Sequence, residues 1–118
     1  MSDPKFSICG EVSLWPEKDQ MAAILRNAGL RVNVGRYSIR IEDCAHFVFR
    51  QYGDDFGEPC IDAECGSLEF MLKDATLVSN ALAKAGLRHR FELYDEDAEQ
   101  VGYLHHEWPS SDVASDIT

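Results

Sequence analysis

Three consecutive side chains near the end of the chain, His105-His106-Glu107, form its most site-like string. An imidazole titrates near neutral pH, so it can act as a general acid or base or bind a metal ion. Zinc-binding helices place two histidines four residues apart, so that both reach the same ion. Neighbouring residues of a strand point to opposite faces instead. The string therefore predicts no shared metal site, and we expect neither metal nor cofactor; His105 alone is kept as a candidate ligand-binding residue.

The four cysteines are the other candidate reactive groups. Cys44 and His46 lie two residues apart, so a strand would place both on one face as a thiolate–imidazole pair. Cys60 and Cys65 are five residues apart, which divides them between the faces of a regular strand, and no second pair completes a zinc site. We interpret this pair as buried structural thiols, because free cysteine is among the most buried residue types. Together with Cys9 they are expected to be free rather than bridged.

Cations gather in the middle of the chain, where Arg40 and Arg50 belong to strand-like sequence. The simplest role of such arginines is to pair with acids across a sheet. The alternative is an anionic ligand, because the guanidinium group suits carboxylate and phosphate. A small-molecule-binding protein or minor enzyme, with its pocket between helices and sheet or on the open sheet face, is therefore one functional hypothesis. Its candidate ligand-binding residues are Arg40, Cys44, His46, Tyr103 and His105.

The acidic residues are distributed unevenly. The 118-residue chain has a net charge of −10, but residues 1–52 carry +1, from seven Lys/Arg and six Asp/Glu, and residues 53–118 carry −11, from four and fifteen. A surface of this sign repels phosphate backbones, so nucleic-acid binding is not expected. One interpretation is a solvated face that keeps the protein soluble. The other is a surface for a basic partner, since complementary charge speeds association and suppresses wrong partners.

The leading hypothesis is a non-catalytic protein-binding module that engages a basic partner through its second half, as an inhibitor or immunity-like protein does. Aromatic residues stand among the acids of this half, a composition that suits protein interfaces. The candidate partner-binding residues are Asp54, Asp55, Glu58, Asp95, Glu96, Asp97, Glu99, Tyr103 and Trp108.

Two apolar stripes predict the helices that position these residues. In the first, Met21, Ile24, Leu25 and Ala28 recur at helical spacing, and Pro16 is expected at the first helical position. The second stripe starts after residue 67, a serine suited to an N-cap, and ends at residue 86. Strands are predicted over residues 6–15, 30–42 (as one strand or two), 46–52, 60–65, 89–94 and 101–108.

A repeated phrase divides the chain into two halves. Ala28-Gly29-Leu30-Arg31 returns 57 residues later as Ala85-Gly86-Leu87-Arg88, and each copy closes a helical stripe with a glycine suited to the left-handed C-cap. The halves, about 5–52 and 60–108, both predict strand–helix–strand–strand. The expected fold is α+β, with two helices on one face of a largely antiparallel sheet. A ferredoxin-like sandwich and a tandem βαββ arrangement both fit.

Residues 1–109 are expected to form a single domain, followed by a disordered acidic tail over 110–118. No apolar run approaches the roughly 18 residues of a membrane span, and residues 1–5 lack the pattern of a signal peptide. We therefore expect a cytoplasmic protein without membrane contact. The strand that ends the last hairpin could also pair with a copy of itself, which makes a homodimer a further possibility.

Overall fold

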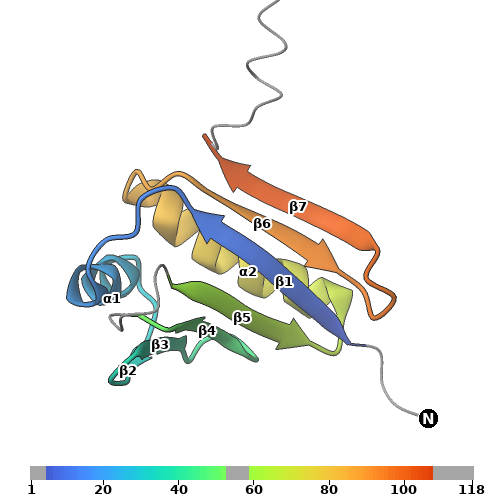
Figure 1. Ribbon diagram of the computed structural model, residues 1–118, viewed down its shortest axis with the longest axis horizontal. Helices are drawn as coiled ribbons and strands as arrows, with labels where there is room; N and C mark the ends of the chain where they lie inside the picture. The colour runs from blue at the N-terminus through green and yellow to red at the C-terminus, as the bar shows by residue number, and fades with distance from the viewer. Residues whose placement is uncertain (1–4, 53–58, 108–118) are drawn as a thin grey trace, which may run out of the picture.

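The computed structural model describes residues 5–52 and 59–107, which form one seven-stranded antiparallel sheet and two helices (Figure 1). The predicted α+β class is confirmed. The predicted tail over 110–118 lies outside the described residues. In chain order the elements are β1 (Phe6–Val12), α1 (Lys18–Asn27), β2 (Val32–Val34), β3 (Ser38–Ile41), β4 (Phe47–Arg50), β5 (Cys60–Cys65), α2 (Leu68–Lys84), β6 (His89–Tyr94) and β7 (Gln100–His106).

The two halves of the chain are interleaved in the sheet. Its strand order is β2-β3-β4-β5-β1-β6-β7, so the first strand lies between two strands of the second half. Ile8 of β1 is in register with Ala63 of β5 on one side and with Leu93 of β6 on the other. The two edges of the sheet are therefore β2, which follows α1, and β7, the last strand.

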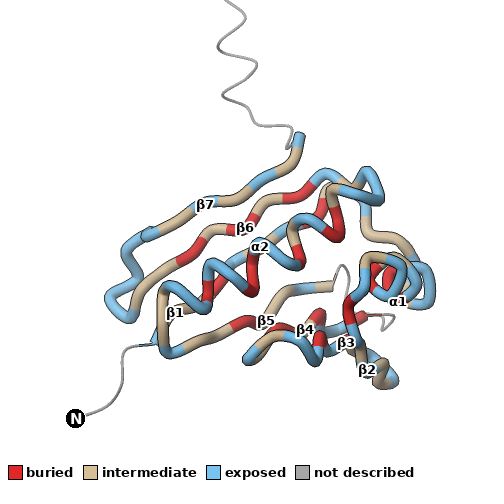
Figure 2. The backbone as a smooth tube through the Cα atoms, turned by 180° about the vertical axis from the view of Figure 1, so that it is seen from behind, coloured by how far each residue is buried: buried red, intermediate tan, exposed pale blue. Residues whose placement is uncertain are grey.

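Alternate residues of the strands face the helices and form the core (Figure 2). Its centre is aromatic, because the ring of Phe47 lies 5.7 Å from the rings of both Phe49 and Phe91. Met21 and Leu25 of α1 are fully buried in the same cluster, as the first stripe predicts, so both helices cover one face of the sheet. From α2 the buried residues of the predicted stripe are Met71, Ala75, Val78 and Leu82.

Both copies of Ala-Gly-Leu-Arg end their helix in the same way. Gly29 and Gly86 have φ angles of 94° and 79°, the left-handed conformation predicted for the C-cap. In each copy the leucine after the glycine donates its N–H back to the last turn of the helix, which satisfies a carbonyl that the helix leaves free. These bonds run from Leu30 N to Leu25 O (3.1 Å) and from Leu87 N to Leu82 O (2.9 Å).

The start of the first helix differs from its prediction by two residues. The helix begins at Lys18, with Glu17 as its N-cap, and Pro16 lies before it. The Pro16 carbonyl accepts the Tyr52 hydroxyl, which holds this segment against β4, while Gln20 Oε1 accepts the Glu17 N–H at 3.1 Å. This tertiary contact holds Pro16 outside the helix, although proline favours the first helical position.

A buried carboxylate joins α2 to the turn before β4. Asp74 is 9% exposed, and its Oδ2 accepts the N–H of Ala45 at 3.0 Å. Replacing Asp74 by alanine is expected to lower the free energy of unfolding by about 1–3 kcal/mol, because the Ala45 N–H loses its acceptor. Urea denaturation measures the change, and Lys73→Ala on the exposed side of α2 is the control. An Asp74→Ala variant as stable as the control would contradict this role.

Candidate functional site

The face of the sheet opposite the helices is polar. Because side chains alternate along a strand, the residues that do not face the core gather on this open face. The helices contact the other face, and no element within 5–52 and 59–107 covers this one. The open face carries Ser38 and Arg40 from β3, Arg50 from β4, Cys60, Asp62 and Glu64 from β5, Ser7, Cys9 and Glu11 from β1, Arg90, Glu92 and Tyr94 from β6, and Tyr103 and His105 from β7.

Basic side chains on the β4 side of this face meet an acid of β5. Asp62 Oδ2 lies 3.3 Å from His46 Nε2 and 3.5 Å from Arg50 Nη1. Arg50 thus pairs across the sheet, as expected, whereas Arg40 is exposed and has no ion pair within the part of the chain that the structure describes. Asp62 is therefore already engaged by two partners from the neighbouring strand.

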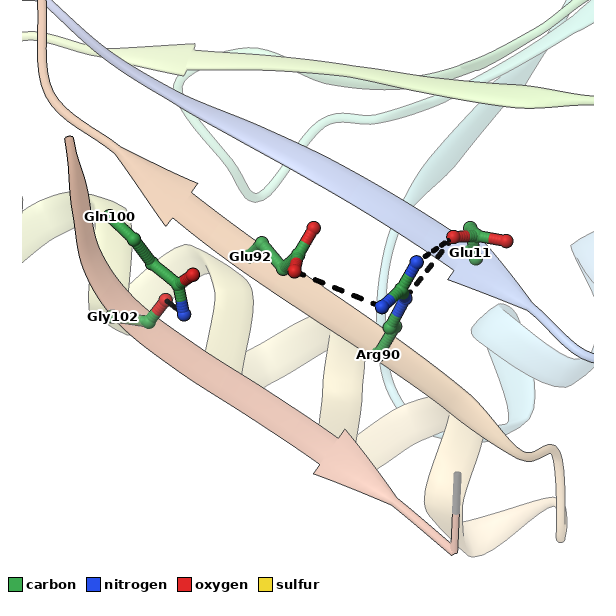
Figure 3. Close-up of polar contacts among 5 residues, drawn as sticks. All are labelled: Glu11, Arg90, Glu92, Gln100 and Gly102. Atoms are coloured by element: carbon green, nitrogen blue, oxygen red, sulfur yellow. Dashed lines mark hydrogen bonds and ion pairs between the residues drawn. The ribbon is translucent and has the colours of Figure 1, made fainter. Parts of the chain in front are cut away.

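The negative charge in the middle of the open face is reduced in a similar way. Arg90 of β6 binds Glu11 of β1 with its Nε and Nη2 atoms, and its Nη1 lies 3.8 Å from Glu92 Oε2 (Figure 3). Side-chain hydrogen bonding to Glu11 raises the pKa of Arg90, so the cation is retained at every ordinary pH. Partly exposed pairs of this kind add little stability. Their effect here is that one guanidinium group balances one of the two carboxylates in the centre of the sheet.

Acids dominate a shallow hollow at the end of this face where β1 begins and β6 turns into β7. The hollow has a volume of about 520 Å³. Three of its lining residues carry carboxylates and one carries an ammonium group, which lies 3.7 Å from a glutamate oxygen. The hollow therefore keeps a net negative charge after its internal pairing. It is lined by Lys5, Ser7, Glu64, Tyr94, Asp95, Glu96 and Ala98.

The loop beside the hollow is built by one of its own acids. Asp95 Oδ1 accepts the N–H groups of Asp97 (2.9 Å) and Glu99 (3.0 Å), and Ala98 takes a positive φ of 62° to close the turn. The carboxylate of Asp95 is thus occupied by the backbone. The exposed side chains of Glu96, Asp97 and Glu99 have no ion pair among the described residues, which leaves their charges available to another molecule.

Tyr94 supplies an aromatic wall to the hollow. Partial burial, together with the nearby Glu92 carboxylate, raises the pKa of Tyr94, so its phenol stays neutral at physiological pH. Glu64 and Tyr94 were absent from the residues chosen on sequence grounds. Ser7 is in register with both of them, and this pairing of three distant segments creates the wall. The alternation of side chains along each strand predicts which face Glu64 and Tyr94 occupy. No local sequence signal predicts that these two residues lie close together.

The structure brings part of the predicted partner-binding set together. Asp95 and Glu96 line the hollow, with Asp97 and Glu99 in the same loop. Tyr103 lies on the open face of β7 opposite Glu92 and does not line the hollow. The remaining members, Asp54, Asp55, Glu58 and Trp108, lie outside the described residues.

The alternative ligand-binding set is not one site. Arg40 lies on β3 and His105 on β7, five strand spacings apart, or roughly 24 Å. The prediction that Cys44 and His46 share one face of a strand is wrong, because this segment is a turn. Cys44 Sγ lies 3.9 Å from the carbonyl oxygen of Asp74, on the helical side of the sheet. His46 instead contacts an acid, Asp62, on the open face. Burial raises the pKa of Cys44 to about 12, which keeps the thiol protonated.

Two further expectations about chemical groups have different outcomes. All four cysteines are free, but neither Cys60 nor Cys65 is buried as predicted: Cys60 is exposed at the start of β5 on the open face, and Cys65 is half-buried. His105 and His106 point to opposite faces, as predicted. The His106 ring stacks 5.9 Å from the buried ring of His89, and the His105 ring lies 5.2 Å from that of Tyr103 on the other face.

No helix of the described residues has the length and apolar character needed to cross a membrane. Comparisons with known protein families, with curated proteins and with solved structures found no match to this chain.

Proposed function

We propose that this protein is a non-catalytic binding module that engages a basic protein partner, in the manner of an inhibitor or immunity-like protein. The observation that supports it is the hollow at the end of the open face, where Glu64, Asp95 and Glu96 line the same hollow as Tyr94 and Lys5 is the one basic residue of the lining. Elsewhere on this face Asp62 is paired with Arg50, and Arg90 balances one of its two acids, Glu11 and Glu92. The hollow, with three carboxylates and one ammonium group, therefore carries a larger excess of negative charge than either of these groups.

A lysine or arginine side chain of the partner is the group that fits this hollow. Carboxylates on its rim attract the cation over distances near the Debye length and orient the approaching protein. The face of an aromatic ring such as Tyr94 also attracts a cation placed over it. An arginine gains further from a bidentate hydrogen bond to a carboxylate such as Glu64, the strongest form of that contact. The exposed acids of the loop form the surrounding rim.

The test is affinity capture from the source cell's lysate with two charge-matched variants. Glu64→Gln/Glu96→Gln removes two charges from the hollow and leaves Asp95, which builds the loop, in place. Asp19→Asn/Glu42→Gln removes two exposed charges elsewhere. The expected result is a basic protein recovered at low salt by the wild type and the control, and reduced roughly tenfold with the hollow variant.

Three outcomes of this capture would contradict the proposal. The first is a partner that the hollow variant and the control bind equally well. The second is binding that does not change between low and high salt, because an interaction steered by charge is screened. The third is a capture that recovers no basic protein. The candidate residues of the small-molecule alternative lie at opposite sides of the sheet, so they do not line one pocket.

We also infer a cytoplasmic location and a fold of the tandem type, in which the first half has four strands (β1–β4) instead of the expected three and the second half has three (β5–β7). Exposed free thiols at Cys9 and Cys60 are compatible with the reducing cytosol. A repeat is supported by the identical helix ends at Gly29 and Gly86. In a ferredoxin-like sandwich β5 would be a minor strand, whereas here it pairs with both β4 and β1. Residues 1–109 remain the predicted extent of the domain.

A further inference from the structure

The last strand, β7, forms one edge of the sheet along its whole length (Figure 1). It has seven residues and pairs only with β6 among the described elements, whereas the opposite edge strand, β2, has three. An edge strand carries a row of backbone N–H and C=O groups that another strand can bind. The long edge of this sheet is therefore β7.

The side chains of β7 do not protect this edge. Natural edge strands discourage pairing with lysine, proline or inward-pointing charge, and Gln100–His106 contains no proline, Lys, Arg, Asp or Glu. Val101 is 36% exposed and Tyr103 42% exposed. Leu72 of α2 is also partly exposed, and it lies over the edge, 3.6 Å from the position that a Cβ of Gly102 would take. Apolar surface thus accompanies the free backbone.

We propose that β7 pairs antiparallel with β7 of a second copy of this chain, joining two sheets into one. A two-fold axis makes such a contact self-complementary, because the same strand supplies both sides. Pairing centred on Tyr103 places Tyr103 opposite its own copy, and Val101, which the irregular register against β6 leaves without a partner in that strand, opposite His105 of the second copy. No like charges meet within the paired strands, which is unusual for a chain whose net charge is −10.

The antiparallel direction also separates the acidic loops. In each copy the acidic loop precedes β7, so it lies beside the C-terminal end of the other copy's β7. The two loops are therefore separated by the full length of the paired strands. Gln100 is then opposite His106 of the second copy. The one repulsive pair, Glu99 against Glu107, falls just outside the strands, and Glu107 Oε2 already lies 3.1 Å from its own His106 Nε2. A parallel pairing would bring the two loops together instead, which favours the antiparallel form.

Sedimentation equilibrium over a concentration series tests this pairing on the full chain. The wild type is expected to approach twice its mass of 13.3 kDa as concentration rises. Tyr103→Lys sets two ammonium groups opposite each other and is expected to raise the dissociation constant of the dimer at least about tenfold. Asn33→Lys adds the same charge to the other edge strand, β2, and should leave the dimer unchanged.

Hydrogen exchange of the wild type gives a second readout that needs no substitution. The amides of β7 should exchange more slowly at high concentration, while those of β2 do not change. A chain that stays monomeric, or a dimer that Tyr103→Lys leaves intact with β7 amides unprotected, would overturn the proposal. In the monomeric case the edge is left for a strand of a different protein.

Discussion

Replacing Phe47 by alanine is expected to lower the free energy of unfolding by about 3–5 kcal/mol, as for other fully buried phenylalanines. Its side chain is fully buried, and its ring lies 5.7 Å from those of Phe49 and Phe91. Phe47 is also in register with Ala63 of β5, so it stands where the two halves of the chain join. The small side chain opposite it cannot fill the cavity that truncation would leave.

Chemical denaturation measures this loss, and Phe70→Ala is its matched control. Phe70 lies on α2 but is 59% exposed, so the same truncation there should change stability by no more than about 0.5 kcal/mol. A domain of this size is stable by about 5–15 kcal/mol, which means that Phe47→Ala removes a large share of the total. Equal stability of the two variants would show that the centre of the core lies elsewhere.

Most of the elements could be predicted from the sequence, because their signals are local. The stripe of Met21 and Leu25 and the glycine at position 29 depend on residues within one helix and its cap, and each lies as predicted. The start of that helix was misplaced because Pro16 makes a contact with Tyr52, 36 residues away. Local preferences do not contain such contacts, and tertiary structure overrides them.

The order of the strands could not be predicted in this way. Alternation shows which side chains of a strand share a face, but it does not show which strands are neighbours. Only the placement of β1 between β5 and β6 brings Glu64 and Tyr94 to the same hollow. The acidic loop was identified from its charge, while the wall beside it depends on long-range pairing. The error at Cys44 has the same origin, since its partner, Asp74, lies on a helix of the other half.

One buried group that the sequence did not single out is expected to link the stability of the fold to pH. His89 alternates with Phe91 and Leu93 on the core side of β6, and all three are fully buried. Its Nδ1 lies 2.8 Å from the carbonyl of Leu87, so that nitrogen carries the proton, and Nε2 accepts from the Ser79 hydroxyl at 2.7 Å. Both ring nitrogens are satisfied by the neutral imidazole.

Burial lowers the pKa of His89 below its usual value of 6.5, with the hydrogen bond to Leu87 opposing the shift and His106 and His105 adding to it. Above about pH 7 the histidine is neutral in both the folded and the unfolded chain. As the pH falls through 6.5, the unfolded chain binds a proton that the folded chain does not. The free energy of unfolding is therefore expected to decrease between pH 7 and the lowered pKa, by about 1.4 kcal/mol for each unit of the shift.

Replacing His89 by glutamine is expected to flatten this acid-induced loss, because the amide retains hydrogen-bonding groups but does not titrate. Denaturant midpoints measured from pH 8 down to pH 5, at constant ionic strength, give the slope for each variant. His105→Gln removes a histidine from the open face of β7 that makes the smallest contribution to the shift, so its slope should be only slightly shallower than that of the wild type. His89→Gln could also lose stability toward acid as steeply as His105→Gln. In that case the proton is taken up at another group, and the buried His89 does not cause the pH dependence of stability.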